Sequence, residues 1–556
     1  MKRLLTLMIM MVVLVTAACT NGNNQQNAEG SSTEVDTNTN SDTEDFGQTT
    51  GAEKPITIQF GSAIDVNAGF AVDLKEATGE TWEDNRWTRL YKEKLNVETK
   101  YKLHVPAGQY SQKLKLAIAS NDLPDMFSVP VANLTDLKQL AEGGAIQEMG
   151  SIYEEYASPL LRSIIEAEGA SVFDPLTFNG KIYGVPIKMP STNEYNHLWV
   201  RQDWLDKLGL ERPKTMNDVY TIAKAFAEQD PDGNGRKDTI GLSINKDFMD
   251  VPTGMAGLFW GYGAFPEFWY KGEDGKITNG SIQPEMKEAL RLLAKMYQQG
   301  LLDKEFGTKD YVKASELMAS GKAGLFYGPH WAAGTANNSR QNDPKANWAV
   351  VPLPVVEGVD LEIPLKISTD GAYVVRAGFE HPEKLVEMMN HYVEMLFAEG
   401  ADLSKWWTEG DIDAVWLMSP VYTLKPTVDL EAHTNMKEAI ANGTTDQLTG
   451  VAKGFYDSIQ KGAWNMEMMF GPKDTPFEFV ASTYPDKILW SEWQNAPTPT
   501  QVTAGSSIQE LVNTSLTGII MGKVDVDTGF DNFVKNWNKI GGEQIIKEIN
   551  EARVNQ

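Results

Sequence analysis

Apolar and polar residues alternate along this chain in two different periods, which predict strands and helices in turn. In residues 56–60 every second residue is apolar, as in a strand with one buried face, and the same alternation returns in residues 97–105. Between these segments, Trp87, Leu90 and Tyr91 recur at helical spacing. The order continues through a helix at 114–118, a strand at 126–129 and a helix at 134–141. Strands that alternate with helices indicate a largely parallel α/β sheet.

A second region with the same alternation begins after the Gly and Pro residues of segment 179–186. A capping-box sequence at residues 215–218 precedes a helix whose apolar face comprises Val219, Ile222 and Phe226. The pattern then predicts a helix at 286–296, strands at 323–327, 349–352 and 372–376, and a helix at 385–392. The fold class predicted for the body of the chain is therefore α/β, with a mostly helical C-terminal part.

The first residues have the three parts of a secretory signal. Lys2 and Arg3 precede an apolar run at 4–15, and small residues lead into Cys19, the only cysteine of the chain. At about 1.5 Å per residue the run is about 18 Å long, too short for a bilayer core of about 30 Å. We therefore expect residues 1–18 to be cleaved. The end of the segment resembles the lipobox of bacterial lipoproteins, in which the cysteine receives a diacylglycerol. An ordinary secretory signal with an incidental cysteine is the alternative.

The segment after Cys19 is polar and nearly free of apolar residues. Such a composition cannot offset the entropy lost on ordering. We expect residues 19–55 to be a flexible tether that holds the body of the protein about 30 Å from the membrane.

The charge balance excludes several classes of function. The chain has 556 residues, with 50 Lys and Arg against 76 Asp and Glu and a formal net charge of −26. A surface of this sign does not favour nucleic acids or anionic membranes. One cysteine excludes an intramolecular disulfide and a cysteine-rich metal site, and the six histidines lack the spacing of zinc enzymes. We expect no nucleic-acid partner.

One loop has the spacing of a calcium-binding site. Asp230, Asp232, Asn234 and Asp238 occupy positions 1, 3, 5 and 9 of an EF-hand-type loop, and Arg236 at position 7 offers its backbone carbonyl. Position 12 is a glycine where an EF-hand has a bidentate glutamate, which argues against a calcium sensor. We expect a structural Ca²⁺ remote from the ligand. A turn without metal is the alternative, because Asp-Gly and Asn-Gly pairs form turns by themselves.

Several aromatic residues lie where Gly and Pro interrupt any helix, most clearly in the segment FWGYGAFPEFWY at 259–270. Flat aromatic rings stack on the apolar faces of sugars, and polar side chains bind the hydroxyl groups at the edge. Loop tryptophans are as often core residues as ligand contacts. The candidate ligand-binding residues of this kind are Trp260, Tyr262, Trp269, Tyr327, Trp331, Trp406 and Trp407.

Five segments together resemble the extracellular solute-binding proteins of bacterial ABC transporters, family 1, in the long lipoprotein branch that includes alginate-binding proteins. These segments are the lipobox-like end at Cys19, NGKIYGVPI at 179–187, VRQDWLDKLGLERPKTMNDVYTIAKAF at 200–226, DPDGNGRKDTIGL at 230–242 and the C-terminal stretch at 519–550.

This resemblance implies a type II periplasmic-binding-protein-like fold of two α/β lobes, with several hinge crossings and the ligand in the cleft. One lobe would comprise 56–186 plus 367–425, and the other 187–366 plus 426–556. Such a protein closes on its ligand and offers the closed form to separate ABC permease subunits, so no covalent step is needed. The resemblance implies a monomer, lipid-anchored at the extracellular face of the cell membrane.

The resemblance also assigns roles to single residues. It favours Trp269 and Trp331 as ligand contacts, because the corresponding loops of the family approach the ligand. Asn193, Tyr195 and Asp370 are added as candidates because they lie at the predicted crossings between the lobes.

In related proteins, an acid often completes the calcium loop where this chain has Thr239. The long form of the family more often looks like a carrier of oligosaccharides than of single sugars.

Two other classes of function remain open at this point. A secreted glycoside hydrolase needs two suitably spaced carboxylates, and the sequence does not single out such a pair among its 76 acidic residues. A peptide-binding lipoprotein would use similar aromatic and acidic residues. A hydrolase would shorten an oligosaccharide, whereas a binding protein would return it intact.

Overall fold

The structure is a computed structural model that describes residues 54–62, 68–105, 107–190, 195–249, 251–366, 369–409, 412, 414–495 and 497–554. The expected signal at 1–18, the tether up to residue 53, Cys19 and Asn193 lie outside the described residues. Residues 54–556 group into one unit by their contacts. Within the described part of the chain, no helix combines the length and the apolar character needed to cross a membrane.

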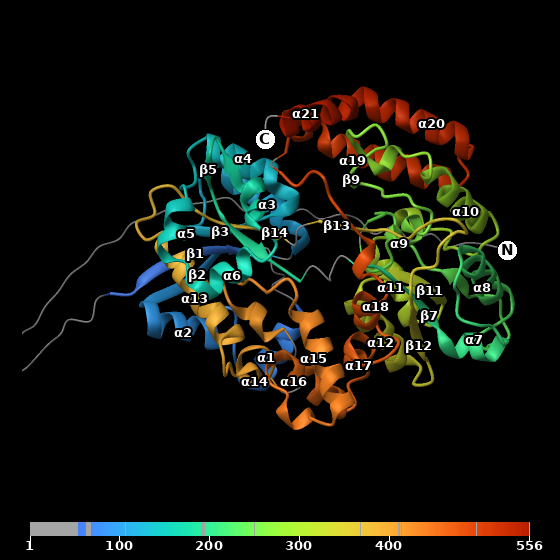
Figure 1. Ribbon diagram of the computed structural model, residues 1–556, viewed down its shortest axis with the longest axis horizontal. Helices are drawn as coiled ribbons and strands as arrows, with labels where there is room; N and C mark the ends of the chain where they lie inside the picture. The colour runs from blue at the N-terminus through green and yellow to red at the C-terminus, as the bar shows by residue number, and fades with distance from the viewer. Residues whose placement is uncertain are drawn as a thin grey trace, which may run out of the picture. The chain divides into compact units, whose positions relative to one another are not determined.

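The first sheet has five strands in the order β2-β1-β3-β14-β6 (Figure 1). Its strands are β1 (Ile56–Ser62), β2 (Val97–His104), β3 (Met126–Pro130), β6 (Val185–Lys188) and β14 (Thr369–Val375). β1 runs parallel to β2 and β3, whereas β14 runs antiparallel to both of its neighbours. The helices that accompany this sheet are α1 (Gly69–Thr78), α2 (Arg86–Leu95), α3 (Ala107–Ala119), α4 (Leu134–Glu142), α5 (Gly150–Tyr156), α6 (Pro159–Ile165) and α13 (Glu383–Phe397).

Both faces of the first sheet are buried. In β14, Tyr373 and Val375 belong to one buried cluster, and the alternate residues Ala372 and Val374 belong to another. Successive side chains of a strand point to opposite faces, so helices must cover the sheet on both sides. The helix predicted around Trp87 is confirmed as α2, which an Asn85 capping box starts.

The second sheet has four strands in the order β12-β7-β11-β8. They are β7 (His197–Arg201), β8 (Ile240–Leu242), β11 (Ala323–Gly328) and β12 (Trp348–Val351). β11 is parallel to β8, and β7 is antiparallel to both β11 and β12. The helices of this region are α7 (Gln202–Leu208), α8 (Met216–Glu228), α9 (Ala256–Trp260), α10 (Met286–Gln298), α11 (Tyr311–Ala319) and α12 (Ala333–Asn342).

In each sheet all strands but one run in the same direction, as the sequence predicts, and the one reversed strand makes both of its pairings antiparallel. These strands, β7 and β14, are the ones that the chain enters directly from the other sheet's region, through residues 189–196 and 366–368. A strand that starts at the edge where its neighbours end must run against them. The antiparallel strands therefore follow from the crossings.

The remaining elements comprise three small strand pairs and the C-terminal helices. The pairs are β4 (Thr177–Phe178) with β5 (Lys181–Ile182), β9 (Trp269–Lys271) with β10 (Ile277–Asn279), and β13 (Ile363–Leu365) with β15 (Ile488–Trp490). The helices are α14 (Leu403–Trp406), α15 (Val428–Asn442), α16 (Gly450–Gln460), α17 (Trp464–Phe470), α18 (Pro476–Ser482), α19 (Pro499–Ile520), α20 (Val526–Trp537) and α21 (Glu543–Val554).

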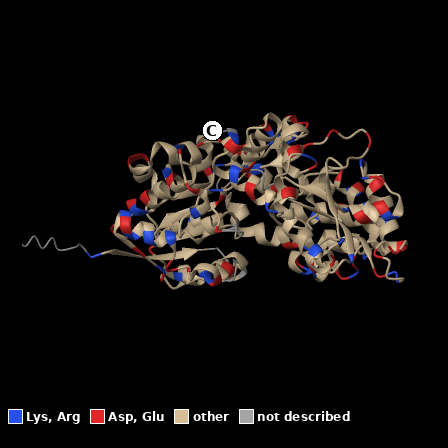
Figure 2. Ribbon diagram, turned by 90° about the horizontal axis from the view of Figure 1, so that it is seen from below, with Lys and Arg blue, Asp and Glu red and all other residues tan. Residues whose placement is uncertain are grey.

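The two sheets have separate cores. One large buried cluster draws its residues from 58–187 and 373–428, and the other from 195–365 and 432–537. This division gives the α/β fold two lobes. Acidic and basic residues are interspersed along the ribbon of both (Figure 2).

Candidate functional site

In the first sheet, strand ends and a chain crossing meet at one edge. β1 ends at Ser62 and β6 ends at Lys188. β14 begins at the same edge, because Thr369 pairs with Lys188 and Gly371 pairs with Pro130 at the end of β3. Ligands of open α/β sheets bind at the carboxyl ends of the strands.

The second sheet has a matching edge. β7 begins there at His197, which pairs with Gly328 at the end of β11. Three residues, 366–368, separate the end of β13 at Leu365 from the start of β14. At about 3.6 Å per residue, this segment keeps Leu365 and Thr369 within about 14 Å. The crossing at 189–196 joins the end of β6 to the start of β7, and the crossing at 366–368 joins β13 to the start of β14. We therefore treat the two edges as one candidate site.

Among the predicted aromatic contacts that the structure describes, Trp331 is the exposed one. It follows β11 directly, in the short 3-10 helix His330–Ala332. Its side chain is 39% exposed, although it is a large aromatic residue beside a buried strand. An exposed ring at the carboxyl end of a strand offers a stacking surface to a ligand.

Asp370 projects from the edge of the first sheet. The pairing of β14 with β6 shifts register between Thr369 and Gly371, as in a β-bulge, and Asp370 lies at this shift, exposed. The hydroxyl of Tyr422 donates a hydrogen bond to Oδ2 of Asp370 at 3.0 Å. The surrounding protein desolvates the carboxyl group and raises its pKa.

Tyr195 also lies at the edge, but its ring is turned inward. The residue is 4% exposed and stacks on Tyr484 with ring centroids 6.1 Å apart. Next to it, burial lowers the pKa of His197 to about 3, so this imidazole is neutral near pH 7. Tyr195 therefore packs inside the second lobe against Tyr484, and little of its side chain is available to a ligand.

Four of the predicted aromatic contacts lie in the cores. Trp406 and Trp407 pack against Trp87 and Trp416 with ring centroids 4.6 and 5.8 Å apart, and both are less than 10% exposed. Tyr327 is fully buried in the second sheet, and Trp260 is 4% exposed at the end of α9. All four residues are at most 8% exposed, so the structure does not support them as ligand contacts.

Trp269 and Tyr262 are half-buried. Trp269 lies on β9 and packs beside a small cluster of Ile277, Ile545 and Ile549. Burial raises the pKa of Tyr262 to about 12. The contacts place Trp269 against the C-terminal helix α21 and do not bring it to Trp331.

Two residues at the edges escaped the sequence prediction. Lys188 is fully buried at the end of β6 and forms an ion pair with Glu168. Tyr422 follows a Ser-Pro pair and precedes Pro426, and the same Gly and Pro criterion that singled out Trp331 would have found it. Leu424, close by, donates its N–H to the carbonyl of Lys188 at 2.9 Å, so a third chain segment reaches this edge.

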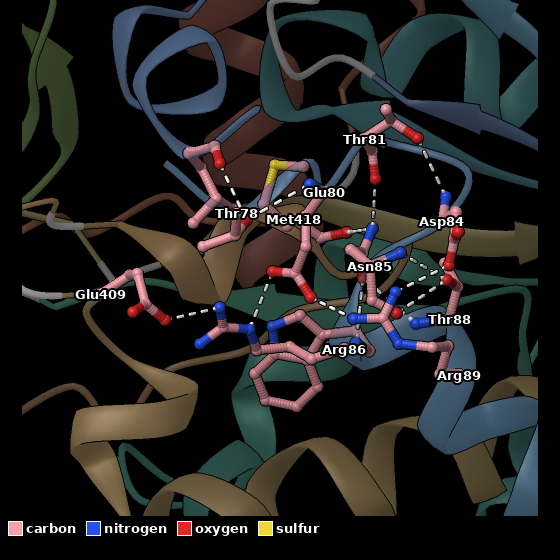
Figure 3. Close-up of polar contacts among 12 residues, drawn as sticks. Thr78, Glu80, Thr81, Asp84, Asn85, Arg86, Thr88, Arg89, Glu409 and Met418 are labelled. Atoms are coloured by element: carbon pink, nitrogen blue, oxygen red, sulfur yellow. Dashed lines mark hydrogen bonds and ion pairs between the residues drawn. The ribbon is translucent and has the colours of Figure 1, made fainter. Parts of the chain in front are cut away.

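A buried polar network fastens the segment before Tyr422 to the start of α2 (Figure 3). Arg86 donates from Nε to Glu80 at 2.9 Å and forms an ion pair with Glu409 at 2.7 Å. Asn85 donates to the carbonyl of Met418 at 3.1 Å. These contacts hold Glu409 and Met418 against the start of α2.

In the predicted calcium loop, the side chains of the expected ligands form hydrogen bonds within the loop itself. The two carboxylate oxygens of Asp230 accept N–H groups of Asn234 and Gly235 at 3.1 and 3.0 Å. The Asn234 amide nitrogen donates to Asp232 at 2.7 Å and to Asp238 at 3.0 Å. Both carboxylates therefore lie within hydrogen-bond distance of one atom.

A lysine supplies positive charge to this loop. Nζ of Lys322 lies 2.7 Å from Oδ2 of Asp238 and 3.8 Å from Oδ2 of Asp232. Thr239 is buried and donates to the carbonyl of Phe226 at 2.7 Å, so it does not face the loop centre. Among the residues that the structure describes, no three His, Cys, Asp or Glu side chains are grouped to hold a metal ion. The oxygen donors themselves are of the type that binds calcium.

Comparison with known proteins identifies relatives over most of the chain. Lipoprotein LipO of Bacillus subtilis is 24% identical over 459 residues, which cover 80% of this chain and 84% of LipO. The polygalacturonan/rhamnogalacturonan-binding protein YtcQ of the same species is 30% identical over 224 residues, 40% of this chain and 43% of YtcQ. FusA of Streptococcus pneumoniae, a fructooligosaccharide ABC transporter substrate-binding protein, is 30% identical over 216 residues, 37% of this chain and 39% of FusA.

Solved structures share the fold. An EF-hand mutant of S. pneumoniae FusA in complex with fructo-nystose has a TM-score of 0.62 at 18% identity, over 90% of this chain and 100% of FusA. The alginate-binding protein AlgQ2 without calcium ion has a TM-score of 0.61 at 16% identity, over 90% of this chain and 98% of AlgQ2. These neighbours support the type II two-lobed fold predicted above.

The family model for bacterial extracellular solute-binding proteins matches residues 73–393, more than half of the chain. This match spans the strands of both sheets after β1, together with the crossings that join them. The chain belongs to the bacterial extracellular solute-binding protein family.

Proposed function

We propose that this protein is the ligand-binding component of an ABC importer, and that it captures an oligosaccharide between the facing edges of its two sheets. The single observation that carries the proposal is the exposed ring of Trp331 at the carboxyl end of β11. A sugar stacked on this ring would meet the polar groups of the opposite edge, among them Asp370.

Two relatives support a carbohydrate ligand. YtcQ is named for polygalacturonan and rhamnogalacturonan, and FusA for fructooligosaccharides. The first ligand is anionic and the second is neutral, so the names leave the class of sugar open. Both are named as binding proteins, which favours binding over hydrolysis for this chain.

Ligand capture would proceed by closure of the two lobes. The grouping of buried residues supports two lobes close to the expected 56–186 plus 367–425 and 187–366 plus 426–556, although Ile187 and Val428 pack with the first lobe, and the connections lie at residues 189–196 and 366–368. A ligand that contacts both lobes stabilises the closed form, because only that form offers all its contacts. The closed monomer would then dock on the permease, while the acylated Cys19 keeps it at the extracellular face of the membrane.

Ligand-dependent unfolding tests the proposal. A ligand that binds only the folded state raises the unfolding midpoint. We expect one oligosaccharide of a broad panel to raise the midpoint of the wild type and to be recovered intact by chromatography. Trp331→Ala should weaken its affinity by about 10-fold or more, since a lost stacking contact costs about 1–3 kcal/mol. Shortened products would support a hydrolase instead, and a midpoint raised only by peptides would support a peptide carrier.

The loop at Asp230 would bind calcium as a structural ion, in competition with Lys322. Asp230, Asp232 and Asp238 carry oxygen donors of the type that binds a hard cation, although the structure does not group them around a metal position, and the ammonium group of Lys322 already neutralises part of their charge. Calcium should raise the unfolding midpoint of the wild type by less than about 2 °C relative to chelator and that of Lys322→Met by more. A midpoint that calcium leaves unchanged in both proteins would show that the loop is a turn without metal.

A further inference from the structure

The charge at the crossings between the lobes decides which class of sugar can bind there. Lys188 forms an ion pair with Glu168 at the end of β6. Lys425, one residue after Leu424, forms an ion pair with Glu431 at 2.7 Å. Both lysines are thus already paired with a carboxylate of the protein itself.

The lysine of the second crossing, Lys366, also lies near an acid. Burial raises the pKa of the Glu267 carboxyl group, and the nearby ammonium group of Lys366 opposes this shift. The neutral imidazole of His197 adds no charge near pH 7. Among the described lysines of the crossings, Lys188 and Lys425 are therefore paired with carboxylates, and the charge of Lys366 acts on the buried carboxyl group of Glu267.

The carboxylate of Asp370 differs from the other acids, since it makes no ion pair within the described part of the chain. It is exposed, and its one hydrogen bond to a side chain comes from the neutral hydroxyl of Tyr422 at 3.0 Å. Tyr422 is 8% exposed, and its N–H donates to the hydroxyl of Tyr373 at 3.1 Å. A ligand at this edge therefore meets a fixed negative charge.

A fixed carboxylate discriminates between neutral and acidic sugars. It accepts hydrogen bonds from hydroxyl groups, and such charge-assisted bonds are about twice as strong as neutral ones. It repels the carboxylate of a uronate placed at the same position. The formal charge of −26 adds a weaker repulsion at longer range.

We propose that Asp370 makes this site selective for neutral oligosaccharides over uronate-containing ones. The inference rests on the function proposed above and narrows its ligand. It assigns Asp370 a direct contact with sugar hydroxyl groups, on the side of the site opposite Trp331.

Isothermal titration with two matched panels tests the inference. One panel contains neutral fructo-, gluco- and galacto-oligosaccharides of three to five units, and the other contains oligogalacturonates of the same lengths. The best neutral ligand should bind the wild type at least about 100-fold more tightly than any oligogalacturonate at low salt. This ratio of affinities should fall at 1 M NaCl, because salt screens the repulsion between carboxylates.

Three variants separate the local charge from the net charge. Asp370→Asn should lower the affinity for the best neutral ligand by about 10-fold. It should also reduce the ratio between this affinity and that for the oligogalacturonates by at least 10-fold. Asp370→Glu, which keeps the charge, should retain the wild-type preference. Glu211→Gln removes the same charge after α7, at the opposite end of β7 from His197, and should change neither affinity. The unfolding midpoint of each variant, measured without sugar, shows whether it is folded.

The outcomes distinguish this inference from the proposed function. An oligogalacturonate that binds the wild type as tightly as the neutral sugars overturns the selectivity and leaves carbohydrate capture intact. If the wild type binds neutral sugars more tightly but folded Asp370→Asn retains the same ratio of affinities, the assignment of the selectivity to Asp370 is overturned. If neither panel binds, the proposed function itself fails.

Discussion

Removal of Arg86 should strongly destabilise the first lobe. Its side chain is 11% exposed, and that of its partner Glu80 is 7% exposed. Arg86→Met would remove the contact to Glu80 and the ion pair with Glu409. A carboxylate left buried by the loss of one partner typically costs about 3–5 kcal/mol. Arg89 still contacts Glu80, so we expect about 3 kcal/mol, the lower end of this range.

Unfolding monitored by tryptophan fluorescence measures this loss, because Trp87 and Trp406 lie in the core of the same lobe. For a lobe of about 150–250 residues, a loss of about 3 kcal/mol corresponds to a midpoint lowered by roughly 6–12 °C. Arg89→Met is the matched control. Its side chain is 55% exposed, so its ion pairs should contribute less than about 1 kcal/mol.

The double variant Glu80→Met/Arg86→Met completes the argument. It removes both buried charges, so it should be more stable than Arg86→Met alone. Equal midpoints for Arg86→Met and Arg89→Met would refute the reasoning. A double variant whose loss of stability equals the sum of the losses measured for Glu80→Met and Arg86→Met alone would refute it as well.

Two further predictions concern the edges of the sheets. Burial lowers the pKa of His197 to about 3, below its unfolded value of about 6.5, so its contribution to stability is complete above pH 6.5 and is lost as the pH falls towards 3. Unfolding midpoints between pH 7 and 4 should therefore fall less steeply for His197→Gln than for wild type, and equal slopes for the two proteins would contradict this prediction. Gly371→Ala would place a Cβ atom 2.3 Å from the carbonyl oxygen of Val129, and it should cost about 2 kcal/mol or more in urea unfolding. Gly505→Ala, in α19 with no atom within 4 Å of the new Cβ, should instead stabilise by about 0.5–1 kcal/mol, and equal effects of the two substitutions would contradict the argument.

The periodicity of the sequence determined most of the local structure. Val219, Ile222 and Phe226 are buried in α8 as their spacing predicts, and Thr215 forms the capping box at its start. Apolar spacing and caps act within a few residues of one another, so a single chain read in order contains this information. The order of strands and helices likewise gave the α/β class and, with the resemblance, the two lobes.

Only the tertiary structure decided which aromatic residues stay open to a ligand. Trp331 and Trp406 look equivalent in the sequence, since neither lies on a long amphipathic helix. The fold exposes the first at a strand end and packs the second against Trp87. Burial depends on neighbours hundreds of positions away, and no local pattern contains them.

The charge environment of the site also depends on distant contacts. The sequence singled out Asp370, but its hydrogen bond to Tyr422 joins residues 52 positions apart. The ion pair of Lys322 with Asp238 likewise joins residues 84 positions apart, and it neutralises part of the negative charge of the predicted calcium loop. The sequence by itself determined which polar groups are available, and folding decided which of them neutralise one another, because electrostatic energies depend on distance in space.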